Sequence, residues 1–143
     1  MSECILEPEQ YHILWRASFF SLATSLYAIY KGHYNLAFCP AGVFCTSINY
    51  WRHPDYSWRR YVDMTYVHLA LLYQLRAASR AEYGNNYYAI MAVGACCYQV
   101  GVVYFKKKDY WLSTYAHVGL HFIANVGNLV LYSGKIGGSP MLG

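Results

Sequence analysis

The chain of 143 residues has the length of one domain, but 57% of its residues are hydrophobic, 19% are aromatic and only 13% are charged. A soluble domain carries about 25% charged residues, so this composition excludes a disordered chain and does not suit a surface that faces water. The net charge of +4 comes without a continuous basic stripe, which argues against a nucleic-acid partner. A lipid bilayer is therefore the expected solvent.

Five stretches of the chain suit transmembrane helices, which need about 20 largely apolar residues. In chain order they cover residues 11–31, 34–52, 60–78, 85–105 and 110–132. The second, fourth and fifth largely coincide with runs that contain no charged residue, while the first includes Arg16 and the third includes Asp63. Because the connections are short, we predict an all-α fold: a polytopic integral membrane bundle of about five helices that forms a single domain over residues 1–143.

The charges of the short connections predict the orientation of this bundle. Six basic residues lie on the side of the N-terminus and four lie on the other side: Arg52, Arg59, Arg60, Lys106, Lys107 and Lys108 against Lys31, Arg76, Arg80 and Lys135. Cytoplasmic loops of membrane proteins carry an excess of Lys and Arg. The sequence therefore predicts a multi-pass protein with a cytoplasmic N-terminus, and it does not identify the membrane.

The last predicted helix carries a polar stripe. Ser113, His117, His121 and Asn125 recur at intervals of four, and Asn128 follows three residues later, so all five lie along one helix face. Lipid cannot satisfy imidazole or amide groups, and this face is expected to look into the bundle. The stripe has two interpretations: hydrogen bonds to neighbouring helices, or two histidines one turn apart that present nitrogens to a metal ion.

Most other histidines belong to the same half of the predicted bundle. With a rise of about 1.5 Å per residue, His68 and His117 both lie about 12 Å inside the membrane from the N-terminal side. His53 lies at the end of the second helix on that same side. Histidines that serve only as core residues have no reason to segregate in this way, so this half of the membrane is the expected place for chemistry.

Asp63 is the one acid within a predicted apolar span. An unpaired carboxylate there is costly, so it is expected to find a cation, a metal or a proton. Arg16 on the first helix or Arg60 on its own helix would make a structural ion pair. A catalytic role, or a role in orienting a ligand imidazole, is the alternative.

These residues resemble the membrane hydrolase superfamily that includes alkaline ceramidases and adiponectin-receptor-like proteins. The resemblance rests on Ser47 late in the second helix, Asp63 early in the third, and His117-x-x-x-His121 in the last. It implies a zinc ion held by three histidines, whose bound water attacks a lipid amide or ester, with Asp63 and Ser47 in catalytic roles. Trp51 stands one turn after Ser47, where the family has a histidine, so His53 or His68 is left as the third ligand.

Two other functions stay open on sequence grounds. The first is a non-catalytic accessory or scaffold subunit, because a small protein with very short loops suits a place in a larger membrane complex. The second is haem binding, with His68 and either His117 or His121 as axial ligands at similar depth. The expected partners are accordingly the lipid bilayer, a lipid substrate or the subunits of a membrane complex.

Overall fold

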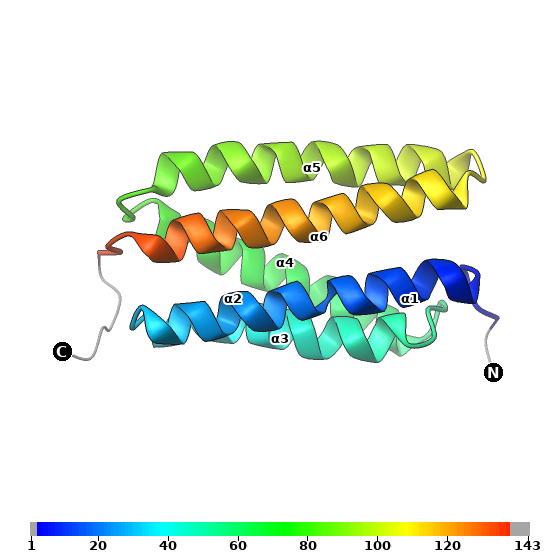
Figure 1. Ribbon diagram of the computed structural model, residues 1–143, viewed down its shortest axis with the longest axis horizontal. Coiled ribbons are helices and arrows are strands. Elements are labelled where there is room, and N and C mark those ends of the chain that lie inside the picture. Colours follow the sequence, from blue (N-terminus) through cyan, green and yellow to red (C-terminus); the bar gives the residue numbers. More distant parts are fainter. Residues whose placement is uncertain (1–2, 138–143) are drawn as a thin grey trace.

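The computed structural model describes residues 3–137, and every regular element in that range is an α-helix (Figure 1). The helices are α1 (Pro8–Ala17), α2 (Phe19–Tyr30), α3 (Tyr34–Trp51), α4 (Trp58–Ala78), α5 (Gly84–Lys106) and α6 (Tyr110–Ser133). The predicted all-α class is confirmed. All five predicted stretches are helical, and the first is interrupted at Ser18 and so forms α1 and α2.

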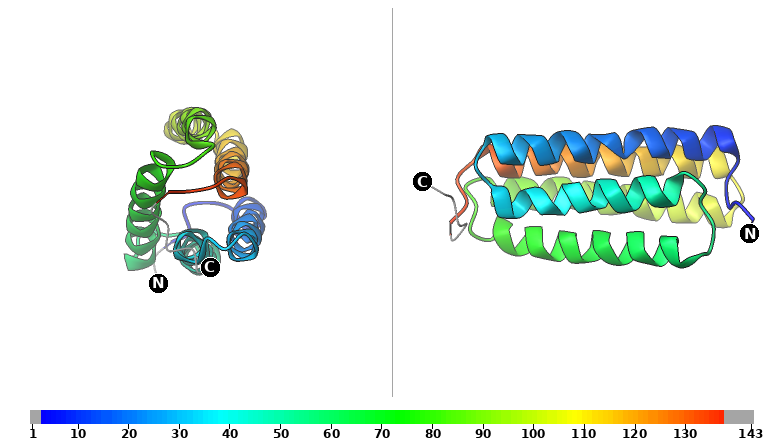
Figure 2. Two further views of the ribbon diagram at one scale, coloured as in Figure 1. Left: turned by 90° about the vertical axis from the view of Figure 1, so that its left-hand side faces the viewer. Right: turned by 90° about the horizontal axis from the view of Figure 1, so that it is seen from below.

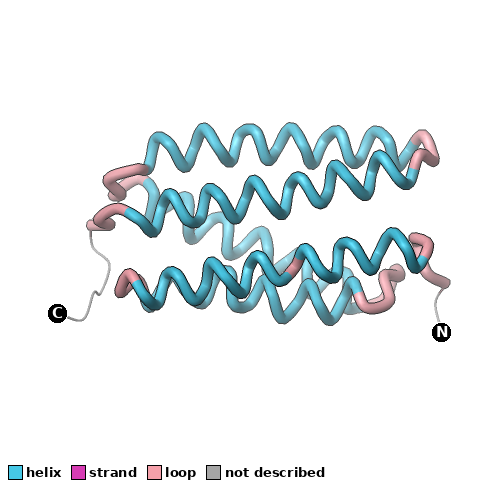
Figure 3. Tube along the Cα trace, viewed as in Figure 1, coloured by secondary structure: helices cyan, strands magenta, loops and turns pink. Residues whose placement is uncertain are grey.

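The interruption at Ser18 is small, and α1 continues into α2 with nearly the same direction (Figure 3). The Ser18 hydroxyl donates to the Leu14 carbonyl at 3.0 Å, a local bond that competes with the backbone ladder and often bends a helix. At the other end of α1, Pro8 takes the first helical turn and the Glu7 backbone N–H donates to the Gln10 side chain at 2.9 Å. A proline and a capping bond of this kind fix the start of a helix.

Two backbone carbonyls near the interior proline of α3 accept hydrogen bonds from neighbouring helices. Pro40 has no N–H to donate, which weakens the hydrogen-bond ladder around it. The Ser25 hydroxyl on α2 donates to the Ala37 carbonyl at 2.9 Å, and the Tyr66 hydroxyl on α4 donates to the Phe38 carbonyl at 2.6 Å. These bonds also fix α3 between α2 and α4.

The helices form a ring around the bundle axis. Going round it, α5 packs on α6, α6 on α1 and α2, these on α3, and α3 on α4 (Figure 2). The remaining pair, α4 and α5, makes little contact although a short turn joins the two helices. We call the end with residues 3–7, 52–57 and 107–109 the amino-terminal end, and the end with residues 31–33, 79–83 and 134–137 the opposite end.

Apolar packing is concentrated at the two ends of the ring. The larger cluster, at the opposite end, contains Ala28, Leu36, Ala37, Ala77, Ala78, Tyr87, Leu131, Tyr132 and Ile136. The smaller cluster, toward the amino-terminal end, contains Leu14, Tyr50 and Trp51.

The outer surface of the ring is strongly apolar. Leu26, Phe38, Leu69, Leu72, Val93 and Phe122 are each at least 53% exposed. Soluble monomers rarely expose contiguous apolar patches of more than a few hundred Å². Within residues 3–137, α5 is the one helix that is long and apolar enough to cross a membrane by length and composition alone.

Candidate functional site

A cavity of about 640 Å³ occupies the centre of the ring, and residues of all six helices line it. It is partly open to the outside. The lining residues that are exposed lie on α4, on α5 and in the segment before α4: Tyr56, Met64, Val67, His68, Ala95, Tyr98 and Lys106. Those contributed by the other helices are buried or half-buried. The cavity therefore opens sideways, between α4 and α5, where the ring is not closed.

Five of the six residues that sequence reasoning singled out face this cavity. Ser47, Asp63, His68, His117 and His121 line it, and His53 does not. The polar stripe of the last helix is also turned inward, since Ser113, His117, His121, Asn125 and Asn128 all line the cavity. The helix periodicity alone placed these side chains on one face.

Asp63 is buried and is held by hydroxyl groups of α3. Thr46 Oγ1 donates to Asp63 Oδ1 at 2.8 Å, and Ser47 Oγ donates to the same oxygen at 3.0 Å. The one salt bridge within residues 3–137 joins Arg59 to Asp55, so the expected ion pair of Asp63 with Arg16 or Arg60 is not formed. Hydrogen bonds of this kind stabilise a carboxylate without a neighbouring cation.

His117 and His121 lie one above the other on α6, with ring centroids 5.1 Å apart. Two imidazoles that share one tetrahedral zinc ion, with Zn–N about 2.0–2.1 Å, have centroids roughly 5 Å apart. The next ring beside His117 is that of Trp51, whose centroid lies 5.1 Å away in an edge-on arrangement. The neighbour of His117 on α3 is therefore an indole, which is not a metal ligand.

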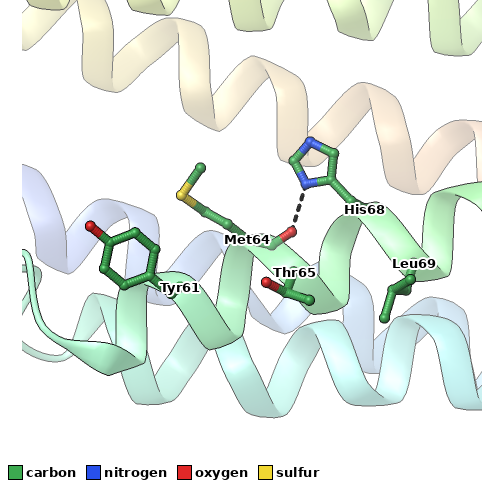
Figure 4. Close-up of a pocket in the computed structure, with 5 residues that line it drawn as sticks. All are labelled: Tyr61, Met64, Thr65, His68 and Leu69. Carbon is green, nitrogen blue, oxygen red and sulfur yellow. Dashed lines mark hydrogen bonds between the residues drawn. The ribbon is translucent and has the colours of Figure 1, made fainter.

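The two candidate third ligands do not join His117 and His121 in a common site. His53 Nδ1 lies 3.1 Å from Cys4 Sγ near the amino-terminal end. His68 Nδ1 is 2.6 Å from the Met64 carbonyl on its own helix, beside a surface hollow lined also by Tyr61, Thr65 and Leu69 (Figure 4). Among the described residues no three His, Cys, Asp or Glu side chains converge on a common point. The residues present do not fit a zinc centre with three protein ligands.

Two hydrogen-bond networks at the cavity wall escaped sequence reasoning. Thr24 Oγ1 donates to Asn125 Oδ1 at 2.9 Å, and Asn125 Nδ2 donates to the His121 carbonyl at 2.7 Å. Nearer the opposite end, Gln74 Nε2 donates to Asn128 Oδ1 at 3.2 Å, and the Tyr132 hydroxyl donates to Gln74 Oε1. The partners come from helices far apart in sequence, so no local sequence pattern predicts these pairs. They satisfy the two asparagines of the α6 stripe.

Two buried donors at the cavity wall have no hydrogen-bond partner among residues 3–137. They are the indole Nε1–H of Trp51, near the amino-terminal end, and the hydroxyl of Tyr87, toward the opposite end. Leaving a buried donor unsatisfied costs about 1–3 kcal/mol. Sequence reasoning missed both residues, because an aromatic side chain in an apolar helix is typical of simple packing. A ligand with oxygen acceptors would satisfy such donors.

Comparison with known proteins adds no relative, because no family model, no curated protein and no solved structure matches this chain.

Proposed function

We propose that this protein is an integral, multi-pass membrane protein that takes a small amphipathic molecule from the bilayer into its central cavity. The observation that carries this proposal is a partly open cavity of about 640 Å³, lined mainly by apolar side chains with a few polar groups among them and bordered by exposed side chains on α4 and α5. Sites for small molecules are typically concave, about 300–1,000 Å³ in volume, and mostly apolar with a few placed polar groups.

The outer surface supports the membrane part of the proposal. Apolar side chains such as Phe38 on α3, Leu72 on α4 and Phe122 on α6 point outward, where lipid would cover them at no cost. The polar side chains that lower the hydropathy of α4 and α6, such as Gln74 and Asn125, point inward and are hydrogen-bonded. This inverted distribution is what a helix bundle in a bilayer requires.

Binding is the function that these residues support, because the described side chains do not assemble the three-histidine site on which hydrolysis by the resembling family depends. The ligand would meet Asp63, His117 and His121 in the amino-terminal half of the cavity. An opening between two helices that face the lipid would let it enter without crossing water.

The proposal is tested by quenching of tryptophan fluorescence in lipid nanodiscs. Trp15, Trp58 and Trp111 are replaced by Phe, so that Trp51 at the cavity wall is the reporter. A brominated long-chain alcohol is expected to quench Trp51 saturably. Ala124→Phe, which fills the cavity, is expected to weaken binding about tenfold or more.

The matched control for this experiment is Ala89→Phe, because Ala89 lies on the exposed face of α5 and does not line the cavity. The affinity of this variant for the brominated alcohol should equal that of the parent protein. Quenching that never saturates, or that is unchanged by Ala124→Phe, would show that the alcohol reaches Trp51 only as bulk lipid and would overturn the proposal.

Haem binding is the second candidate, and the position of His68 favours it. His68 on α4 and His117 and His121 on α6 line one cavity. The contact of His68 Nδ1 with the Met64 carbonyl (Figure 4) fits a tautomer that leaves Nε2 available to a metal. Protein expressed with added haem should show a Soret band that disappears in His68→Ala. A colourless preparation would eliminate this candidate.

A further inference from the structure

We propose that the amino-terminal end of the cavity is a binding site for the anionic head of a single-chain amphiphile, formed by the Arg60 guanidinium, the Lys106 ammonium and the indole N–H of Trp51. This inference rests on the proposed ligand-binding function. It adds that the ligand has an anionic head and that this head lies at the amino-terminal end of the cavity. The head would be a carboxylate or a phosphate, which share the same chemistry toward cations and N–H donors.

The charge of the cavity wall favours an anion. Three formally charged residues line the cavity: Arg60, Lys106 and Asp63. Two positive charges and one negative charge leave a net charge of +1. Asp63 Oδ1 already accepts hydrogen bonds from two hydroxyl groups. Neither cation forms a salt bridge with a carboxylate in the part of the chain that the structure describes.

Trp51 adds a directed donor to these cations. Its side chain is 8% exposed and lines the cavity, and its Nε1–H has no partner within residues 3–137. Trp51 belongs to α3, whereas Arg60 lies in the first turn of α4 and Lys106 in the last turn of α5. Three different helices thus bring an N–H donor and two cations to one end of the cavity. An oxygen of an anionic head would satisfy the donor, which an apolar chain cannot do.

The other half of the cavity suits an uncharged tail. No formally charged side chain lines it, and its amides and the Tyr132 hydroxyl bond to one another. Leu71, Met91 and Leu120 supply apolar wall between these groups. The anionic head therefore belongs beside Arg60 and the chain beside Leu71, Met91 and Leu120, and this ligand does not satisfy the Tyr87 hydroxyl.

The test is calorimetric titration of the full chain in nanodiscs with long-chain amphiphiles that share one alkyl chain. The heads are a carboxylate, a phosphate, an alcohol and a trimethylammonium group. At least one of the two anionic amphiphiles is expected to bind about tenfold or more tightly than the alcohol, and the cation most weakly. The tighter of the two anions identifies the source of the head.

Three variants test which residues cause the preference for an anionic head. The double variant Arg60→Gln Lys106→Gln should bind the anion and the alcohol with affinities within about threefold of each other, because both cations are removed. Trp51→Phe keeps the ring and removes the donor, so it should weaken anion binding about tenfold and alcohol binding less, because a charged oxygen accepts the stronger hydrogen bond. The control is Arg52→Gln, a basic residue of the same end that is exposed and does not line the cavity.

The outcomes separate the two proposals. Equal affinities of the parent for anionic and neutral heads, or an anion preference that survives in the double variant, would overturn the head site while binding in the cavity stands. Absence of saturable binding for all four amphiphiles would overturn the proposed function itself.

Discussion

The indole ring of Trp51 packs edge-on against the imidazole of His117, with the two ring centroids 5.1 Å apart. The centroid of the His121 ring also lies 5.1 Å from that of the His117 ring. Two of the three rings are able to bind a metal and the third is not. At this position the resembling family has a histidine, whereas this chain has an indole.

Trp51→His is therefore expected to create a zinc site. Purified parent protein should hold less than about 0.1 equivalent of zinc, and the variant about one equivalent, because a third imidazole joins His117 and His121. Metal content after dialysis is the measurement, and Trp51→Phe is the control, since it changes the ring without adding a ligand. About one equivalent of zinc in the parent protein, lost in a His117→Ala His121→Ala variant, would contradict this prediction.

Removal of one hydroxyl beside Asp63 should destabilise the bundle. Ser47→Ala leaves a buried carboxylate with Thr46 as its remaining donor, and the expected loss is about 1–3 kcal/mol of the free energy of unfolding. Thermal unfolding in detergent, followed by circular dichroism, measures it. Ser133→Ala serves as the control, because Ser133 is exposed and donates within its own helix. Equal unfolding temperatures for the two variants would show that Asp63 does not depend on Ser47.

The turn between α4 and α5 requires glycine at position 84. A Cβ at Gly84 would overlap the backbone carbonyl of Ala78, and a backbone atom cannot move aside as a flexible side chain can. Gly84→Ala should therefore cost about 1–3 kcal/mol of stability. At Gly119 the nearest atom to an added Cβ is Cys97 Sγ at 3.9 Å, an ordinary contact, so Gly119→Ala should be nearly neutral. Similar melting temperatures for both variants would refute this account of the turn.

Acid should weaken the loop before α4 through Asp55. Hydrogen bonds from Ser57, together with the Arg59 guanidinium at 3.2 Å, lower the pKa of Asp55 below the usual value of about 3.9 for an aspartate. A carboxyl whose pKa is lower in the folded state stabilises that state above the unfolded pKa, and the contribution is lost as the pH falls below about 4. Melting temperatures measured from pH 7 down to 3 should fall less in Asp55→Asn than in the parent. Equal falls in melting temperature with pH for Asp55→Asn and the parent would contradict the prediction.

The proposed membrane topology places the two ends of the bundle on opposite sides of the bilayer. In a cysteine-free background, Glu3→Cys and Lys135→Cys should react with a membrane-impermeant maleimide from opposite sides of sealed vesicles. The excess of basic residues at the amino-terminal end predicts that Glu3→Cys reacts from the cytoplasmic side. Labelling of both positions from one side would contradict a bundle with an odd number of crossings.

The sequence predicted the helices well because their signals are local. Short connections separate long apolar runs, and spacing by three and four residues turned the α6 stripe inward as expected. The break at Ser18 was not predicted. It involves a serine hydroxyl that bonds to its own helix, and the composition of the segment does not reveal such a bond.

The candidate site was predicted only in part, because its partners are set by packing between helices. Ser47 and Asp63 were both singled out from the sequence, and the structure joins them by a hydrogen bond. The pairing of Asn125 with Thr24 and the approach of Trp51 to His117 depend on how helices rotate about their axes. Short loops do not determine that rotation.

The distribution of packing along the bundle has a mechanical consequence. The opposite end is filled with apolar side chains, whereas the cavity extends from the middle of the ring to Trp51 near the amino-terminal end, so the ring is expected to be stiffest at the opposite end. Tyr66 lies over Gly42 and its hydroxyl bonds α4 to α3. The helix expected to move away from the ring is therefore α5. Backbone amides near the middle of α5 should therefore exchange with deuterium faster than those near Tyr87, and a uniform exchange rate along α5 would show that the wall does not flex.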